Sequence, residues 1–174
     1  MNIPSVDESA ERFVRLMPQS TDPVLLILKG HLLVEEHIQA VLNDLLARPE
    51  LLEEARLTFY QRMRLVQSLL GEGNDDYLWM SIRKLNTLRN RMAHVLELND
   101  LEQRVDDYLA DWAEDGFTQS GDEAERANRI LHAVQSTCGI LTGYRQAHRR
   151  IFGDPRFLTQ FTMHTKASAS EDEA

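Results

Sequence analysis

Apolar residues recur every three to four positions along most of this 174-residue chain, and this spacing predicts amphipathic helices. Alternating apolar and polar runs rich in Val, Ile and Thr, which would indicate strands, are absent from the sequence. The sequence therefore predicts an all-α fold, a single-domain helical bundle of about five to six helices. A chain of this length can bury a core without metal ions or disulfides.

The expected helix boundaries follow from capping residues and helix-breaking residues. Asp22 before Pro23 is a typical pair of N-cap and first helical residue, and Gly71 is placed as a C-terminal stop. We expect helices over about residues 7–17, 23–47, 50–70, 76–98, 100–114 and 122–152. The helical domain then covers residues 1–165, and the small, acidic residues 166–174 are expected to form a disordered tail.

Several protein classes are disfavoured by composition and spacing. The single cysteine, Cys138, can form no internal disulfide, and the N-terminal segment lacks the pattern of a secretory signal. The longest apolar run, Val24–Leu28, is far shorter than the roughly 20 residues that cross a bilayer. We therefore expect a cytoplasmic protein without a membrane segment. The histidines show no zinc-type or di-iron spacing, so we expect no metal ion and no cofactor.

Charge is unevenly distributed along a chain whose formal net charge is −9. Residues 77–96 contain no Asp or Glu, residues 97–125 contain eleven acidic residues and one arginine, and residues 126–153 again contain no acid. The candidate RNA-binding residues of the first basic segment are Arg83, Lys84 and Arg91. The two basic segments could bind RNA if they faced one groove; otherwise they are ordinary solvated helix faces. The sequence leaves both interpretations open.

Arg89 and Asn90 precede His94 inside the fourth expected helix. An imidazole can move a proton near neutral pH, and a guanidinium can hold a phosphate through two hydrogen bonds. Asn90 and His94 are one helical turn apart, whereas Arg89 and His94 are about 140 degrees apart around a straight helix. This geometry favours a site that dimerisation completes.

Glu35 lies in the middle of the apolar stripe of the second expected helix. Burial of an unpaired carboxylate is costly, so Glu35 requires a cationic or hydrogen-bonding partner. Arg89, at the edge of the apolar stripe of its own helix, is a natural partner. Under the alternative interpretation Arg89 only neutralises Glu35 in a structural ion pair, and His94 is an exposed helix residue without a catalytic role.

Three features together resemble the HEPN superfamily, including its mannitol-repressor-like branch: the leucine-rich helix with its embedded acid, the helix within Leu57–Gly71, and the segment Ile82–His94 with its R-N-x-x-x-H motif. The resemblance covers about residues 22–98. It implies a helical bundle that forms a homodimer with the two motif helices together. It also implies a metal-independent endoribonuclease site of the kind used in prokaryotic toxin-antitoxin or defence systems.

By matching positions, this resemblance implies that Arg89 and His94 are the catalytic pair, with Asn90 as a polar companion and Glu35 in a supporting position. RNA carries its own nucleophile, the 2′-hydroxyl, so a base and a guanidinium suffice for cleavage. A second hypothesis is a non-catalytic helical regulator similar to mannitol repressors, which binds a protein or nucleic acid. A third is an antitoxin or immunity-type protein whose acidic segment, residues 97–125, mimics nucleic acid.

Overall fold

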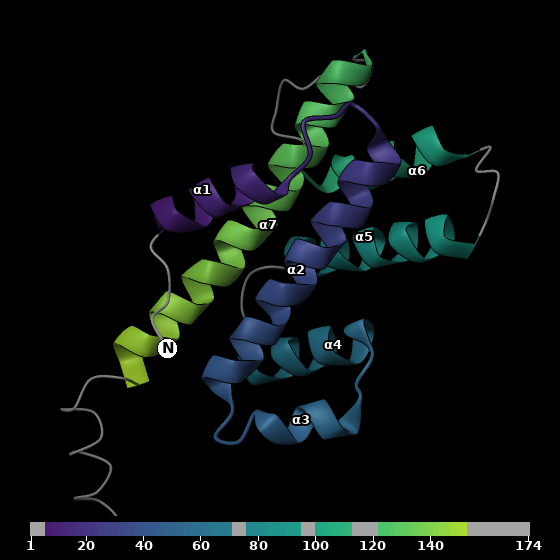
Figure 1. The fold of residues 1–174 in the computed structure, drawn as a ribbon. Coiled ribbons are helices and arrows are strands. Elements are labelled where there is room, and N and C mark those ends of the chain that lie inside the picture. Colours follow the sequence, from purple (N-terminus) through teal and green to yellow (C-terminus); the bar gives the residue numbers. More distant parts are fainter. Residues whose placement is uncertain (1–5, 71–75, 95–99, 113–121, 153–174) are drawn as a thin grey trace, which may run out of the picture.

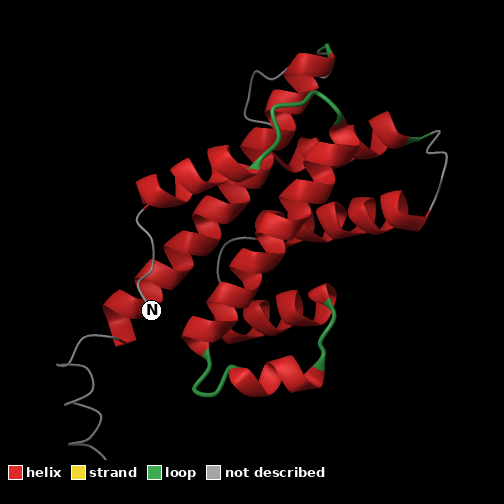
Figure 2. Cartoon of the chain, viewed as in Figure 1, coloured by secondary structure: helices red, strands yellow, loops and turns green. Residues whose placement is uncertain are grey.

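Helices form every regular element in the part of the chain that the structure describes, so the all-α prediction is confirmed (Figure 1, Figure 2). The structure, a computed structural model, describes residues 6–70, 76–94, 100–112 and 122–152. These residues form α1 (Val6–Leu16), α2 (Pro23–Leu45), α3 (Glu50–Ala55), α4 (Phe59–Leu70), α5 (Asp76–His94), α6 (Leu101–Leu109), the 3-10 helix η1 (Ala110–Trp112) and α7 (Glu123–Phe152). The expected tail, residues 166–174, lies outside them.

The third expected helix, residues 50–70, is in fact two helices, and this correction explains why there are seven α-helices in the described residues rather than five or six. Arg56 has a positive φ of 49°, a backbone conformation that ends a helix. Thr58 and Gln61 then form a capping box, in which the Gln61 backbone N–H donates to Thr58 Oγ1 and the Thr58 N–H donates to Gln61 Oε1. The second helix begins at that box.

The long helices α2 and α7 pack against each other along the middle of the molecule (Figure 1). The expected cap of α2 is present, because Asp22 Oδ1 accepts a hydrogen bond of 2.9 Å from the Val24 N–H. The helices approach closely at Gly30, where an added Cβ would lie 2.6 Å from Cγ2 of Val134. Only a residue without a side chain fits at this crossing without displacement of its neighbour.

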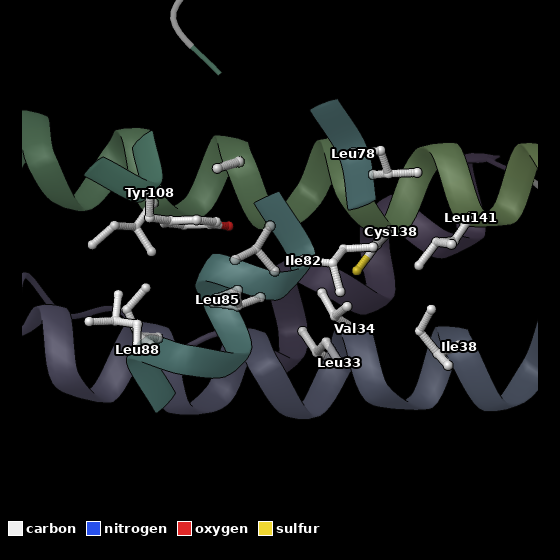
Figure 3. Packing of buried hydrophobic residues seen from close by; sticks show 14 of the residues in the cluster. Leu33, Val34, Ile38, Leu78, Ile82, Leu85, Leu88, Tyr108, Cys138 and Leu141 are labelled. Atoms are coloured by element: carbon white, nitrogen blue, oxygen red, sulfur yellow. The ribbon is translucent and has the colours of Figure 1, made fainter. Parts of the chain in front are cut away.

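The core is completed by α5, whose side chains lie between α2 and α7 (Figure 3). Ile82, Leu85 and Leu88 point inward from α5 and are almost fully buried, as the 3.6-residue spacing predicts. α4 packs on α2 and α5 on one side, and α6 packs on α5 on the other. None of the described helices combines the length and the apolar composition that a membrane crossing needs.

Candidate functional site

The last two turns of α5 carry the arginine and the asparagine of the motif. Arg89 is half-buried and Asn90 is exposed, and Nη1 of Arg89 donates a hydrogen bond of 3.1 Å to Oδ1 of Asn90. His94 is the last residue of α5, and its side chain lies outside the described part of the structure. The structure thus brings Arg89 and Asn90 together and shows that the backbone positions of all three residues belong to one continuous helix.

Glu35 does not pair with Arg89, and the expected partner was wrong. The carboxylate forms an ion pair and hydrogen bond with Nη2 of Arg62, a residue of α4. Nη1 of Arg62 also donates to Oε1 of Gln39, one turn after Glu35, at 3.2 Å. The apolar spacing did not separate α4 from α3, so the sequence did not predict where α4 packs on α2. The contact between Arg62 and Glu35 was therefore not predicted.

His31 is a second polar residue at this crossing that sequence reasoning did not select. Its side chain is 3% exposed, its ring lies on Phe59 with centroids 4.4 Å apart, and its Nε2 is 3.1 Å from Oδ1 of Asn86 on α5. Because an amide oxygen can only accept, Nε2 carries the proton in this arrangement. Nδ1 lies 3.9 Å from Glu35 and has no hydrogen-bond partner among the described residues.

The imidazole of His31 is neutral near pH 7. Burial lowers its pKa below the usual value of 6.5, while the hydrogen bond to Asn86 and the charge of Glu35 oppose this effect. The positive charges of Arg89 and Arg62 also lower the pKa of His31. His31, Glu35, Arg62 and Asn86 therefore form a polar cluster where α2, α4 and α5 meet, and we call it the α2/α4/α5 cluster.

Arg89 lies beside this cluster without a carboxylate partner among the described residues. Its side chain donates a hydrogen bond to a neutral amide, that of Asn90. Glu35, the acid that would otherwise neutralise it, is held by Arg62. Within the described residues, the guanidinium of Arg89 is consequently a positive charge without a carboxylate at a half-buried position, which is the electrostatic property that an anion-binding residue needs.

The three candidate RNA-binding residues differ from one another in the structure. Nζ of Lys84 lies 2.5 Å from Oδ1 of Asp111, and Nη2 of Arg91 lies 3.3 Å from Oδ2 of Asp100. Arg83 is exposed, and its Nε donates to a backbone carbonyl oxygen on its own helix. Two of the three cations are thus neutralised by the acidic segment that follows them in the sequence, and Arg83 has no acidic partner within the ranges that the structure describes.

The second basic segment is also largely compensated by acids. Arg126 lies 3.5 Å from Asp106, and both Arg145 and Arg149 bind Asp44, at 2.5 and 3.1 Å. The groove that contains Arg83 has a volume of about 350 Å³, and its lining comes from α5 and α6 among the described residues. The interpretation in which the two basic segments share one groove, which the sequence left open, does not apply to this groove, because no described residue of α7 lines it.

Metal ligation and thiol chemistry find no site in the described residues. No three His, Cys, Asp or Glu side chains there are grouped closely enough to hold a metal ion. Cys138 is buried, and burial raises the pKa of its thiol to about 12, so this group is a packing residue rather than a nucleophile.

The chain matches no protein-family model, no curated protein and no solved structure. The expectation of a HEPN-type protein consequently rests on the sequence alone.

Proposed function

We propose that the protein is a metal-independent endoribonuclease of HEPN type, acting as a homodimer in a prokaryotic toxin-antitoxin or defence system. One observation carries the proposal: Glu35 forms its ion pair with Arg62, and Arg89 has no acid partner among the described residues. The purely structural role considered for Arg89, neutralisation of Glu35, is thereby removed. The guanidinium of Arg89, beside Asn90 and five residues before His94 on the same helix, is left for a phosphate.

The cleavage chemistry assigns one role to each motif residue. His94 takes the proton of the 2′-hydroxyl, the 2′ oxygen bonds to phosphorus, and the bond from phosphorus to the 5′ oxygen breaks. The 5′ oxygen receives a proton from the second copy of His94 in the dimer, which leaves a 2′,3′-cyclic phosphate and a 5′-hydroxyl. Arg89 stabilises the charge on the pentacoordinate phosphorane, and Asn90 holds the guanidinium in place.

The test is incubation of purified protein with total RNA in EDTA, comparing the wild type with His94→Ala and Arg89→Gln. We expect cleavage by the wild type and a loss on the order of a hundredfold or more in both variants. His132→Ala is a matched control, since His132 is an exposed histidine on α7. Cleavage that persists in His94→Ala would show that another protein or another residue is responsible. No cleavage by any variant would favour the non-catalytic regulator.

The ion pairs in the acidic segment argue against the antitoxin or immunity alternative. Asp111 is 10% exposed and pairs with Lys84, while Asp106 and Asp100 face arginines. Carboxylates that are neutralised within their own chain are poor mimics of a nucleic acid backbone, whose charge must reach a partner. Binding to a nucleic-acid-binding partner that weakened on charge reversal at Asp107, an exposed acid of this segment, would favour that alternative instead.

A further inference from the structure

The choice of partner for Glu35 determines what Arg89 can bind. Glu35 is 30% exposed on α2 and pairs with Arg62 of α4. Arg89 is one turn beyond Asn86 on α5, and Asn86 contacts His31, which is one turn before Glu35 on α2. The α2/α4/α5 cluster thus contains one carboxylate, which is paired with Arg62, and the positive charge of Arg89 also lowers the pKa of its histidine.

We propose that Arg62 is a positioning residue: it holds the Glu35 carboxylate and so leaves the Arg89 guanidinium available to an RNA phosphate. The expected effect on RNA cleavage rests on the proposed function. The effect of Arg62 on the position of the Arg89 side chain rests on the geometry of α2, α4 and α5. Within the described residues Arg62 forms hydrogen bonds with Glu35 and Gln39 and none with Arg89 or Asn90, so its effect on the site passes through Glu35.

The geometry of the helix crossing makes Arg89 the replacement partner when Arg62 is absent. His31 and Asn86 join α2 to α5 by a hydrogen bond of 3.1 Å. Glu35 is one turn beyond His31 on α2, and Arg89 is one turn beyond Asn86 on α5, so both side chains extend from turns next to this contact. A half-buried carboxylate that has lost its counter-charge attracts another cation, and Arg89 is the arginine that this contact brings toward Glu35 from α5.

Arg89 has little to hold it in its present position. Its acceptor is the neutral amide oxygen of Asn90, whereas a carboxylate carries the opposite charge and can accept two parallel hydrogen bonds from a guanidinium. A guanidinium that is paired with Glu35 presents its donors to the carboxylate and not to a phosphate. Arg62 is better anchored, because its Nη1 also binds Gln39 and its side chain is 23% exposed.

The enzymatic test uses four variants. In Arg62→Gln we expect kcat to fall by about tenfold, which corresponds to about 1.4 kcal/mol for the capture of Arg89, while KM changes by less than about threefold. Arg62→Lys keeps the counter-charge and should retain most of the activity. The double variant Glu35→Gln/Arg62→Gln should regain most of the lost kcat, because no carboxylate is left to capture Arg89.

Arg64→Gln is the matched control. It removes the same charge from the same helix. Arg64, however, is exposed, and its Nη1 donates to Oε1 of Gln67, three residues later on α4. We expect no change in kcat for this variant. An Arg62→Gln protein that cleaves RNA as fast as Arg64→Gln would overturn the proposal, and so would a double variant that stays as slow as Arg62→Gln.

A measurement without RNA separates this inference from the proposed function. In 15N-labelled protein the Nε–H signal of Arg89, assigned with Arg89→Lys, should shift in Arg62→Gln and return in the double variant. In protein that keeps Arg62, Glu35→Gln should leave this signal in place. A shift of the Arg89 signal in Glu35→Gln would show that the two residues already interact, and it would overturn the proposal even if Arg62→Gln did not fold.

If the wild type cleaves no RNA but the Arg89 signal behaves as described, the proposed function fails while the positioning by Arg62 stands. If the wild type cleaves RNA and the Arg89 signal is the same in Arg62→Gln and in the wild type, the positioning fails while the proposed function stands.

Discussion

Replacement of Gly30 by alanine tests the close contact between α2 and α7. The new Cβ would lie 2.6 Å from Cγ2 and 3.3 Å from Cγ1 of Val134, and the Val134 side chain is fully buried. Both methyl groups are on a β-branched side chain with one strongly preferred rotamer in a helix, so they cannot rotate away freely. Overpacking of this kind costs about 1–3 kcal/mol, and the higher helix propensity of alanine offsets about 1 kcal/mol. We expect a net loss of stability of up to about 2 kcal/mol.

Gly139 is the matched control for this prediction, because a Cβ at that position meets nothing within 4 Å. Gly139→Ala should stabilise the protein by about 0.5–1 kcal/mol through helix propensity alone. Urea denaturation followed by circular dichroism at 222 nm measures both variants. In addition, Val134→Ala should cost less in the Gly30→Ala background than in the wild type. Equal stabilisation by alanine at Gly30 and Gly139 would refute the close contact.

Three further predictions concern stability. Burial lowers the pKa of His31 below 6.5 in the folded protein, so the unfolded chain binds the proton at a higher pH than the folded chain does. The melting temperature should therefore fall as the pH decreases below about 6.5, and it should fall less in His31→Gln. Asp44→Asn should lower the free energy of unfolding by about 3 kcal/mol in urea titrations, since it leaves Arg145, 12% exposed, without its carboxylate. Thr58→Ala removes one half of the capping box with Gln61 and should cost about 1 kcal/mol in the same assay.

Each of these predictions has an outcome that would contradict it. An identical fall in melting temperature for wild type and His31→Gln would assign the pH dependence to other groups, such as His37, whose pKa is also lowered by burial. Glu50→Gln is the control for Asp44→Asn, because Glu50 pairs with Arg48 at an exposed position and its loss should leave the melting temperature unchanged. Retention of full stability in Thr58→Ala would show that α4 does not depend on its cap.

Much of the fold was predictable from periodicity and caps. The Asp22–Pro23 start of α2 and the Asp122 start of α7 are both present, the latter with the Glu125 N–H donating to Asp122 at 2.9 Å. The break between α3 and α4 was missed because apolar spacing continues across it. The signal was nevertheless in the sequence, since Thr58 and Gln61 have the spacing of a capping box.

The candidate site was less predictable, because its contacts join helices that are distant in the sequence. The apolar spacing placed Glu35 on an apolar stripe, and a carboxylate there needs a cationic or hydrogen-bonding partner. The structure provides this partner in Arg62. Which arginine supplies the charge depends on the crossing of α2, α4 and α5, and Arg62 is 27 positions from Glu35. The pairing of Lys84 with Asp111 has the same origin, since α6 and η1 fold back on α5.

The positions of the motif residues on α5 bear on the proposed dimer. Arg89 extends from the turn after Asn86, which faces α2, whereas Asn90 shares the exposed side of α5 with Arg83 and Thr87. The bond between Arg89 and Asn90 links these two sides at one end of the helix.

One copy of the chain therefore presents few cations to an RNA backbone. Lys84 and Arg91 are neutralised by acids, so Arg83 and Arg89 are the cations of α5 without a carboxylate partner in the described residues. Nonspecific affinity for RNA grows with the number of phosphates that are neutralised, and a chain of net charge −9 repels RNA elsewhere on its surface. Two copies that placed their α5 helices together would double the available cations and supply a second His94 to protonate the leaving oxygen. Under the proposed function, dimerisation is thus a requirement of both binding and chemistry, and the acids that follow α5 are the reason that one copy is insufficient.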